Sequence, residues 1–270
     1  MDNRPIGVFD SGLGGLTAVK ELEKVLPQES LVYFGDTGRV PYGSRSRETV
    51  RRYAKQDMAF LMGHGVKAVL AACGTVSSTA RDIGENLGVP YFDVVRPTAQ
   101  AAAAATQNKK VGVIGTSATI HSGSYRAALL SIDYKLQVFS QPCPLFVPLV
   151  ENAFISPQDE VTRLVAERYL APLRESGVDT LILGCTHYPI IAPTIASVMG
   201  RGVTLIDSGR EAAKALARAL EEGDLLCDGK EPRKASYFVS DEPESFTGVA
   251  ELFLGHSVNG ATARINIENY

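Results

Sequence analysis

Short apolar runs, rich in valine, isoleucine and leucine, alternate along the chain with longer amphipathic segments. Eight runs have the length and composition of buried strands; they lie at residues 6–9, 31–35, 67–72, 111–115, 136–140, 180–184, 203–207 and 236–240. Between residues 48 and 61, apolar side chains recur at helical spacing, which predicts a helix that ends at Gly63. The alternation of strands with helices predicts parallel sheets that are covered by helices on both faces.

Two parts of the chain repeat one pattern. Residues 6–15 (IGVFDSGLGG) resemble residues 111–120 (VGVIGTSATI), and residues 66–75 (VKAVLAACGT) resemble residues 178–187 (VDTLILGCTH). Each of these segments is an apolar strand that ends in small or hydroxyl-bearing residues. We therefore predict an α/β fold of two similar parallel-sheet domains with a pseudo-twofold relation. The functional site is expected in the cleft between them, where the carboxyl ends of the strands meet.

The boundary between the two halves is expected near residues 95–97, ahead of an alanine-rich helix at residues 98–106. The first domain is expected to comprise residues 1–96 together with about 208–270, and the second domain residues 97–207. In this division the last predicted strand and the segment after it pack back on the first half of the chain.

Charge and apolar run length exclude several kinds of partner. The 270 residues carry 27 basic and 30 acidic side chains, for a net charge of -3. No basic cluster is present that would follow a phosphate backbone, so no nucleic acid is expected. The apolar runs are too short to span a bilayer and the N-terminus has no apolar signal core, so no membrane association is expected. These features predict a cytoplasmic protein.

The four cysteines lie far apart in the sequence, at positions 73, 143, 185 and 227, and form no C-x-x-C pair. This spacing predicts free thiols in a reducing compartment, and neither a zinc knuckle nor a dithiol redox motif. The polar residues that follow the other two cysteines in the sequence have no counterpart at Cys143 and Cys227, so structural roles are expected for these two.

Two polar loops follow the first two predicted strands. The loop at residues 10–15 (DSGLGG) opens a helix, so its backbone N–H groups are placed to bind an anion, although a simple tight turn explains the glycines equally well. A dinucleotide fingerprint would need glycine at position 17, where Thr17 stands instead. The loop at residues 35–43 (GDTGRVPYG) lies at the same end of the predicted sheet as Cys73, which favours a role in ligand binding.

Cys73 and Cys185 end corresponding strands of the two repeated halves. Cys185 and His187 supply only half of a metal site, and two further ligands are not evident, so no metal is expected. If the halves face each other, the two thiols face each other across one cleft. Such a pair is suited to removing a proton from one face of a carbon acid and delivering a proton to the other face, which is the chemistry of racemisation.

Six segments support one resemblance, and they occur in order through both halves: IGVFDSGLGGLTA, YFGDTGRVPYG, AACGTVSS, GVIGT, CPLFVPLVE and LILGCTHYP. In this combination the chain resembles the glutamate racemases of the cofactor-independent aspartate/glutamate racemase family. The resemblance implies an isomerase with two α/β domains, an active site between them and no cofactor. It also implies interconversion of L-glutamate and D-glutamate, supply of D-glutamate for peptidoglycan biosynthesis, and a homodimer.

The resemblance assigns acid–base roles to Cys73 and Cys185. It implies that Asp10 and His187 assist the two thiols and that Glu151 lies near the second one. The residues that it implies for substrate binding are Asp10, Ser11, Pro41, Tyr42, Gly43, Gly74, Thr75, Thr116, Thr186 and His187. Most of these offer hydroxyls or backbone amides in place of arginine forks, and neutral donors hold a carboxylate without binding it too tightly.

One position departs from the family pattern. Relatives usually carry asparagine directly after the first cysteine, where its amide contacts the substrate, and this chain has Gly74 there. We therefore expect Gly74→Asn to keep or improve activity, because the amide restores a hydrogen bond to a charged group.

Two other interpretations of the sequence stay open. The near alternative is an aspartate or other amino-acid racemase, which would use the same chemistry. The other is a two-lobed protein that binds a small anion without turnover; it explains the glycine and hydroxyl loops but not the two matched cysteines. The lysines lie mostly on polar helices or loops, where a pyridoxal Schiff base would not be protected, so cofactor-free chemistry is expected.

Overall fold

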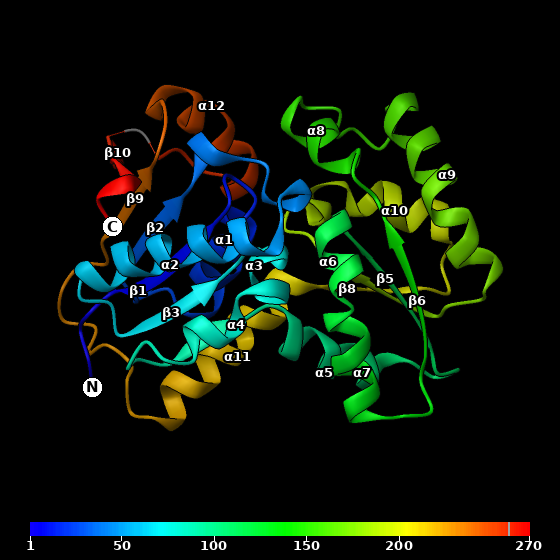
Figure 1. Ribbon diagram of the computed structural model, residues 1–270, viewed down its shortest axis with the longest axis horizontal. Coiled ribbons are helices and arrows are strands. Elements are labelled where there is room, and N and C mark those ends of the chain that lie inside the picture. Colours follow the sequence, from blue (N-terminus) through cyan, green and yellow to red (C-terminus); the bar gives the residue numbers. More distant parts are fainter. Residues whose placement is uncertain (259) are drawn as a thin grey trace.

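The computed structural model describes residues 1–258 and 260–270 and contains two sheets, each in a lobe of its own (Figure 1). The first sheet has the strand order β10-β9-β2-β1-β3-β4, and the second has the order β6-β5-β7-β8. All pairings between neighbouring strands are parallel. The lobe with the six-stranded sheet is named the first domain, and the lobe with the four-stranded sheet the second domain. The predicted class, two parallel-sheet α/β domains, is confirmed.

The strands of the first sheet are β1 (Ile6–Asp10), β2 (Leu31–Gly35), β3 (Ala68–Ala71), β4 (Tyr91–Asp93), β9 (Ala235–Val239) and β10 (Thr262–Arg264). Those of the second sheet are β5 (Lys110–Gly115), β6 (Gln137–Pro142), β7 (Thr180–Leu183) and β8 (Thr204–Asp207). The α-helices are α1 (Leu16–Val25), α2 (Arg47–Gly63), α3 (Gly74–Thr79), α4 (Arg81–Gly84), α5 (Val95–Ala105), α6 (Ser117–Ser122), α7 (Ser124–Ile132), α8 (Phe146–Glu151), α9 (Glu160–Glu175), α10 (Ala192–Met199), α11 (Ser208–Glu222) and α12 (Pro243–Leu254). Short 3₁₀ turns are η1 (Thr37–Arg39), η2 (Tyr42–Ser44), η3 (Tyr188–Ile191) and η4 (Ile267–Asn269).

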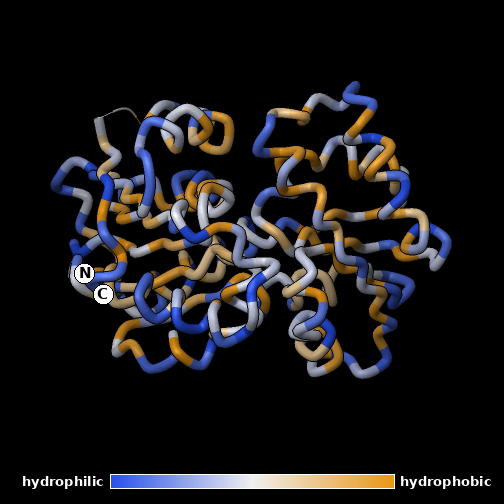
Figure 2. The backbone as a smooth tube through the Cα atoms, turned by 45° about the horizontal axis from the view of Figure 1, so that its top comes forward, coloured by the Kyte–Doolittle hydropathy of each residue, from blue (hydrophilic) through white to orange (hydrophobic). Residues whose placement is uncertain are grey.

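The central strands are buried along their whole length because helices cover both faces of each sheet. All residues of β1, β2 and β3 are buried, as are those of β7. Apolar residues accordingly follow the strands and the inner faces of the helices, and hydrophilic residues lie on the outside (Figure 2). Within residues 1–258 and 260–270, no helix combines the length and the apolar character needed to cross a membrane.

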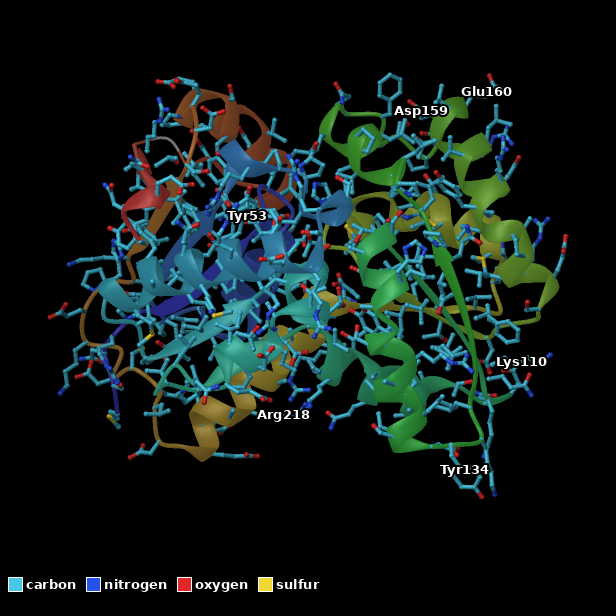
Figure 3. The ribbon with its side chains drawn as sticks, in the orientation of Figure 1. Tyr53, Lys110, Tyr134, Asp159, Glu160 and Arg218 are labelled. Carbon is cyan, nitrogen blue, oxygen red and sulfur yellow. The ribbon has the colours of Figure 1, made fainter. Side chains whose placement is uncertain are left out.

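Two of the longer helices begin at a side-chain cap. Helix α9 begins after Asp159, whose side chain accepts a hydrogen bond from the backbone N–H of Thr162 at 3.1 Å. Asp159 and Glu160 lie together at this end of the helix (Figure 3), where negative charge is favourable. Helix α2 begins in the same way after Ser46.

The C-terminal part of the chain returns to the first sheet. Strand β9 pairs with β2, with Ala235 opposite Leu31, and β10 extends the sheet beyond β9. Helix α11 packs against α1, and Gly209 allows its backbone to approach Ala18 closely. The second domain is therefore formed by the middle of the chain, whereas the first domain uses both ends. The division at residues 96/97 and 207/208 stays a prediction.

Sequence patterns missed two strands and the start of one helix. Strands β4 and β10 have three residues each and only partial burial, so neither forms an apolar run. Helix α5 begins at Val95 and not at residue 98, because the carboxylate of Asp93 accepts the backbone N–H groups of Val95 and Arg96. Pro97 is tolerated there, since the N–H groups in the first turn of a helix have no intrahelical partner.

A buried ion pair joins three segments at the amino ends of the first sheet's strands. Lys67 is fully buried, and its Nζ lies 2.6 Å from Oε2 of Glu29. The same ammonium donates to the backbone carbonyls of Asp2 and Leu225 at 2.7 Å each. The other carboxylate oxygen, Oε1 of Glu29, accepts the backbone N–H of Cys227 at 2.8 Å. The pair thus ties the N-terminus and the link after α11 to the start of β3.

We expect Lys67→Met to lower the free energy of unfolding by about 3 to 5 kcal/mol, because it leaves the Glu29 carboxylate buried without its cation. Urea unfolding followed by circular dichroism measures the loss. The matched control is Lys214→Met, which removes an exposed pair with Glu211 and should cost less than about 1 kcal/mol. Equal losses in the two variants would contradict the structural role given to Lys67.

Candidate active site

A cavity of about 380 Å³ lies between the two domains, at the carboxyl ends of their central strands. This volume suits a small molecule. Helices α3 and α6, one from each domain, meet beside it (Figure 1). The residues that line it are Ser11, Gly12, Leu13, Val40, Pro41, Tyr42, Gly43, Ser44, Cys73, Gly74, Thr75, Thr116, Ser117, Thr119, Pro144, Val147, Pro148, Glu151, Gly184, Cys185, Thr186 and His187. Among the site residues expected from the sequence, Asp10 alone does not line the cavity.

Cys73 stands between the end of β3 and the start of α3. It is 5% exposed, and its Sγ lies 3.6 Å from Oγ of Ser11. Burial, followed by the nearby negative charge of Asp10, raises the pKa of this thiol to about 12. In this conformation Cys73 is therefore a thiol at neutral pH, which is the protonation state that a proton donor requires.

Asp10 ends β1 and lies behind the cavity wall, almost fully buried. Its Oδ2 accepts the backbone N–H of Gly12 at 3.0 Å, whereas Oδ1 has no hydrogen-bond partner among the described residues. Burial raises the pKa of this carboxyl, and the positive charge of His187 opposes the rise. Asp10 thus has an unpartnered buried oxygen, and its charge interacts with both Cys73 and His187. Such an oxygen is able to accept a hydrogen bond from a further donor.

On the second domain, three groups form a chain that starts at the other cysteine. Cys185 follows β7 and is 6% exposed. Its Sγ lies 3.8 Å from Nδ1 of His187, and Nε2 of that histidine lies 2.9 Å from Oε1 of Glu151. Burial alone would lower the pKa of His187, but the hydrogen bonds to Cys185 and Glu151 outweigh it and raise the pKa to about 10. His187 is thus an imidazolium at neutral pH, with one N–H toward each partner.

The two thiols consequently have different surroundings. Cys185 has a cationic hydrogen-bond donor beside it, which generally favours a reactive sulfur. Cys73 has no cation beside it, and burial together with the nearby carboxylate of Asp10 favours its thiol form, which the hydrogen bond with Ser11 opposes only in part. The repeat pattern in the sequence did not reveal this asymmetry. The pattern matches the two strand ends, whereas the asymmetry comes from the residues that the fold places beside each thiol.

Hydroxyl groups cross the cleft beside the thiols. Oγ1 of Thr75, in the first domain, lies 3.1 Å from Oγ1 of Thr116 in the second, and Thr116 lies 3.0 Å from Thr119. The lining of the cavity contains no lysine or arginine within the described part of the chain. A carboxylate in this cavity would therefore be held by hydroxyls and backbone amides.

The two domains approach closely because three positions of the first domain that face the second are glycine. A Cβ atom at Gly14 would lie 2.2 Å from Oγ1 of Thr186, and one at Gly43 would lie 2.9 Å from Cβ of Thr116. A Cβ atom at Gly74 would lie 2.4 Å from the carbonyl oxygen of Gly184. Any side chain at these positions would force the domains apart or distort the loops.

Thr17 adds a further tie between the domains. Its hydroxyl donates to the carbonyls of Gly14 and Thr186, at 2.9 Å each. The residue that breaks the dinucleotide fingerprint thus connects the first loop to the second domain. Sequence reasoning recorded it only as a mismatch.

Sequence reasoning also missed an apolar part of the cavity wall. Leu13 and Val40 supply it from the first domain, and Pro144, Val147 and Pro148 from the second. Leu13 and Val40 lie inside loops that the sequence analysis had selected for their polar residues. The proline residues lie in the segment CPLFVPLVE, so a search for apolar residues within the selected motifs would have found them.

The sequence and the site geometry agree with one protein family. The family model described as Asp/Glu/Hydantoin racemase matches residues 16–216. The chain belongs to this family and is therefore an isomerase of the racemase class.

Comparisons with individual proteins narrow the class. The chain is 45% identical to a glutamate racemase of Geobacter metallireducens, over 98% of this chain and 97% of the relative. It is 46% identical to a glutamate racemase of Chlorobaculum tepidum, over 93% and 92% of the two chains. The crystal structure of glutamate racemase from Francisella tularensis in complex with D-glutamate superposes over the full length of both chains, with a TM-score of 0.93 and 40% identity. Within the family, the chain thus groups with the glutamate racemases.

The structure argues against the expectation that Gly74→Asn keeps or improves activity. The Cβ position at Gly74 meets the backbone of Gly184, and backbone atoms do not rotate away as a long side chain would. The amide could reach a ligand only after the two domains had moved apart. The expectation considered one hydrogen bond and ignored the space that the bond requires.

We now expect Gly74→Ala and Gly74→Asn to lower kcat/KM for the racemised amino acid by roughly tenfold to a hundredfold, because misplacing catalytic groups by about 1 Å has costs of this size. Steady-state racemisation measured by circular dichroism provides the test. The control is Gly248→Ala in α12, where no described atom lies within 4 Å of the added Cβ, and it should match the wild type. Full activity in Gly74→Ala would contradict the close domain contact.

Proposed function

We propose that the protein interconverts L-glutamate and D-glutamate, with Cys73 and Cys185 as two acid–base groups on opposite faces of the α-carbon. The observation that carries this proposal is the presence of two buried thiols, one from each domain, on the wall of one cavity. The similarity to glutamate racemases over nearly the whole chain supports glutamate as the substrate. The similar protein of Francisella tularensis binds D-glutamate.

In the proposed reaction, the Cys185 thiolate removes the α-proton of L-glutamate and becomes a thiol. The Cys73 thiol then donates its proton to the opposite face of the carbanion and becomes a thiolate, which completes D-glutamate. Proton exchange with solvent resets the pair, and the reverse reaction uses the same groups in exchanged roles. No oxidant, reductant or cofactor takes part in this balance.

The neighbouring residues support each half of the reaction. The imidazolium of His187, held by Glu151, stabilises negative charge at the Cys185 sulfur and near the substrate carboxylate. Asp10 lies behind the cavity wall with its Oδ1 unpartnered, and its negative charge favours the substrate ammonium in the cavity. That ammonium in turn favours the carbanion beside it.

Neutral donors hold the two carboxylates in this proposal. The hydroxyls come from Ser11, Thr75, Thr116 and Thr186, which all line the cavity. Backbone N–H groups of Tyr42, Gly43 and Gly74 add donors from the two loops. These donors are neutral, so the imidazolium of His187 is the one cationic side chain that the proposal places near a substrate carboxylate.

We propose three further properties that follow from this function. The D-glutamate product would supply peptidoglycan biosynthesis. The chemistry requires reduced cysteines, which is consistent with a cytoplasmic location. A homodimer is also proposed; exposed apolar side chains of Leu145, Phe154, Val161 and Leu164, on or beside α8 and α9, offer surface for an interface, and sedimentation velocity tests the oligomeric state.

Replacing either thiol should abolish most activity in both directions. Cys73→Ala and Cys185→Ala each remove the base for one direction and the acid for the other, so we expect both rates to fall by at least about 10² to 10⁴. Chiral chromatography of reactions started from L-glutamate, D-glutamate and aspartate measures the rates and the substrate preference. Cys227→Ala serves as the control, because this thiol lies outside the cavity. Turnover of aspartate alone would replace the proposed substrate, and full activity in Cys185→Ala would refute the two-thiol mechanism.

Deuterated water distinguishes two bases from one. At early times, a two-thiol enzyme should place deuterium at the α-carbon of the product enantiomer while recovered substrate stays largely protiated. A single base would return the original proton to either face. Substantial protium in the first product formed, measured by mass spectrometry after chiral separation, would therefore rule out the proposed pair.

Activity should depend on the protonation of His187. Its pKa of about 10 lies above the ordinary value of 6.5, so the imidazolium is present at neutral pH and is lost as pH rises through about 10. Glu151→Gln removes one cause of the raised pKa, so the alkaline limb of kcat/KM should move to lower pH by about 1 unit. Racemisation rates measured across the alkaline range provide the test, with Glu160→Gln as an exposed control. An alkaline limb at the same pH in both variants would contradict this role of Glu151.

A further inference from the structure

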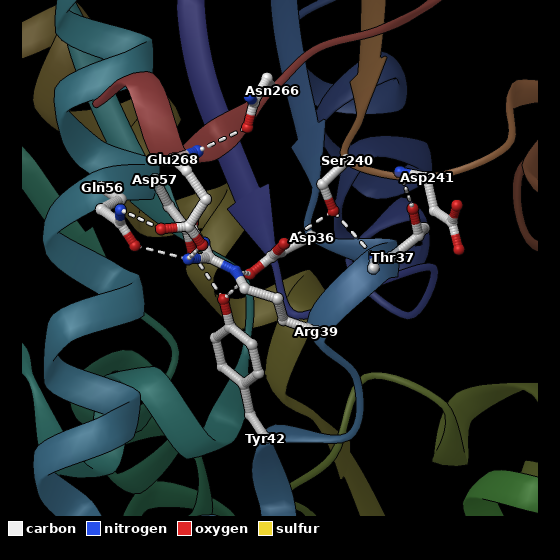
Figure 4. Close-up of polar contacts among 11 residues, drawn as sticks. Asp36, Thr37, Arg39, Tyr42, Gln56, Asp57, Ser240, Asp241, Asn266 and Glu268 are labelled. Atoms are coloured by element: carbon white, nitrogen blue, oxygen red, sulfur yellow. Dashed lines mark hydrogen bonds and ion pairs between the residues drawn. The ribbon is translucent and has the colours of Figure 1, made fainter.

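The side chain of Tyr42 turns its polar end away from the cavity. Tyr42 lines the cavity, but its hydroxyl lies in a buried cluster behind the loop of residues 37–44 (Figure 4). There it donates to Oδ2 of Asp36 and lies 3.1 Å from Oδ2 of Asp57. The phenol is therefore not available to a ligand, and Tyr42 can serve the site only through its ring and its backbone.

Arg39 is the cation of this cluster. Its Nε lies 2.6 Å from Oδ2 of Asp36, and its Nη2 lies 3.1 Å from Oδ1 of Asp57. Both aspartate side chains are completely buried, and the guanidinium lies over the ring of Tyr53 at 4.1 Å from its centroid. At the solvent edge, the guanidinium also contacts Gln56 and Glu268. Figure 4 shows these groups converging from the loop after β2, from α2 and from η4.

The loop needs this support because it has little regular structure of its own. Between β2 and α2 it forms only the short turns η1 and η2, and its inner residues lie on the cavity wall. A second anchor comes from Ser240, after β9, whose Oγ accepts the backbone N–H of Gly38 at 2.8 Å and donates to Oδ1 of Asp36 at 2.7 Å. Both carboxylate oxygens of Asp36 thus accept hydrogen bonds.

The hydrogen bonds of the cluster require a second proton. Tyr42 has one O–H, and it donates that proton to Asp36. The negative charge of Asp36 neutralises the positive charge of Arg39. The 3.1 Å contact between Tyr42 and Asp57 is a hydrogen bond only if Asp57 supplies the proton. Burial raises the pKa of Asp57 well above its ordinary value, the charge of Asp36 raises it further, and Arg39 and Tyr42 oppose the rise.

We propose that Asp57 is a neutral carboxylic acid that donates a hydrogen bond to Tyr42. Tyr42 in turn donates to Asp36, and Arg39 contacts both carboxyl groups. This chain of hydrogen bonds fixes the backbone of residues 40–43 at the substrate cavity. Asp57 and Arg39 are positioning residues in this scheme, since neither lines the cavity. The chain runs one way only, so the cluster holds a single arrangement. The inference rests on the proposed function only in taking glutamate as the ligand that the loop contacts.

Conservative and disruptive variants separate this scheme from simple packing. Asp57→Ala should raise KM for glutamate about tenfold with a smaller change in kcat, because a loosened loop weakens substrate binding by roughly 1.4 kcal/mol. Asp57→Asn should restore KM, because its amide N–H₂ replaces the acid O–H as donor to Tyr42 while its oxygen still accepts from Arg39. Asp36→Asn should not restore KM, because an amide cannot accept from all the donors that meet there. Glu268→Gln, which alters an exposed partner of the same guanidinium, is the matched control.

A spectroscopic measurement tests the proton without any substrate. The infrared difference between wild type and Asp57→Asn at neutral pH should contain the C=O band of a protonated carboxyl, and the same difference for Glu268→Gln should contain only carboxylate bands. A wild type that fails to racemise glutamate would refute the proposed function and leave this band unaffected. An absent band, or an Asp57→Asn variant with the KM of Asp57→Ala and an unchanged melting temperature, would overturn the inference about Asp57.

Discussion

The close approach of two domains at glycine positions is the constraint on which the site depends. Two thiols can act on opposite faces of one carbon only if the strand ends that carry them lie within the length of a small molecule. Gly14, Gly43 and Gly74 remove the side chains that would hold the domains apart, and hydroxyls such as those of Thr75 and Thr116 then join across the seam. The distance between the two thiols therefore depends on how closely the domains pack. In the proposed mechanism, a change that loosens this contact also misplaces the thiols relative to the substrate.

The unequal surroundings of the two cysteines are compatible with a reversible reaction between mirror-image molecules. Two enantiomers have equal free energy in water, so the efficiencies of the forward and reverse reactions must be equal at every pH. The difference between Cys73, beside Asp10, and Cys185, beside His187, cannot favour one product. It bears instead on the resting state of Cys73, whose pKa is raised to about 12 and which therefore keeps its proton at neutral pH.

The sequence was a good guide to whatever follows from local pattern. Apolar runs indicated eight of the strands, and repeated strand endings led to Cys73, Cys185 and the loops around them. Properties that depend on distant contacts were inaccessible. The space beside Gly74 is set by Gly184, more than a hundred positions away, and the expected benefit of asparagine took no account of it. Asp57 lies within a helix that reads as ordinary amphipathic sequence, and only the folded chain brings it to Tyr42. The part of the site that sequence missed is thus the part built by packing.

The order of segments in the chain also has a consequence for synthesis on the ribosome. The four-stranded sheet is encoded by one uninterrupted stretch and has all its strands as soon as Asp207 has emerged. The six-stranded sheet is completed later, because β9 pairs with β2, which is synthesised some two hundred residues earlier. Throughout that interval the nascent chain carries a partly built sheet whose β2 edge is open to wrong partners. The segment that begins with β9 therefore closes the edge that β2 has left exposed since much earlier in synthesis.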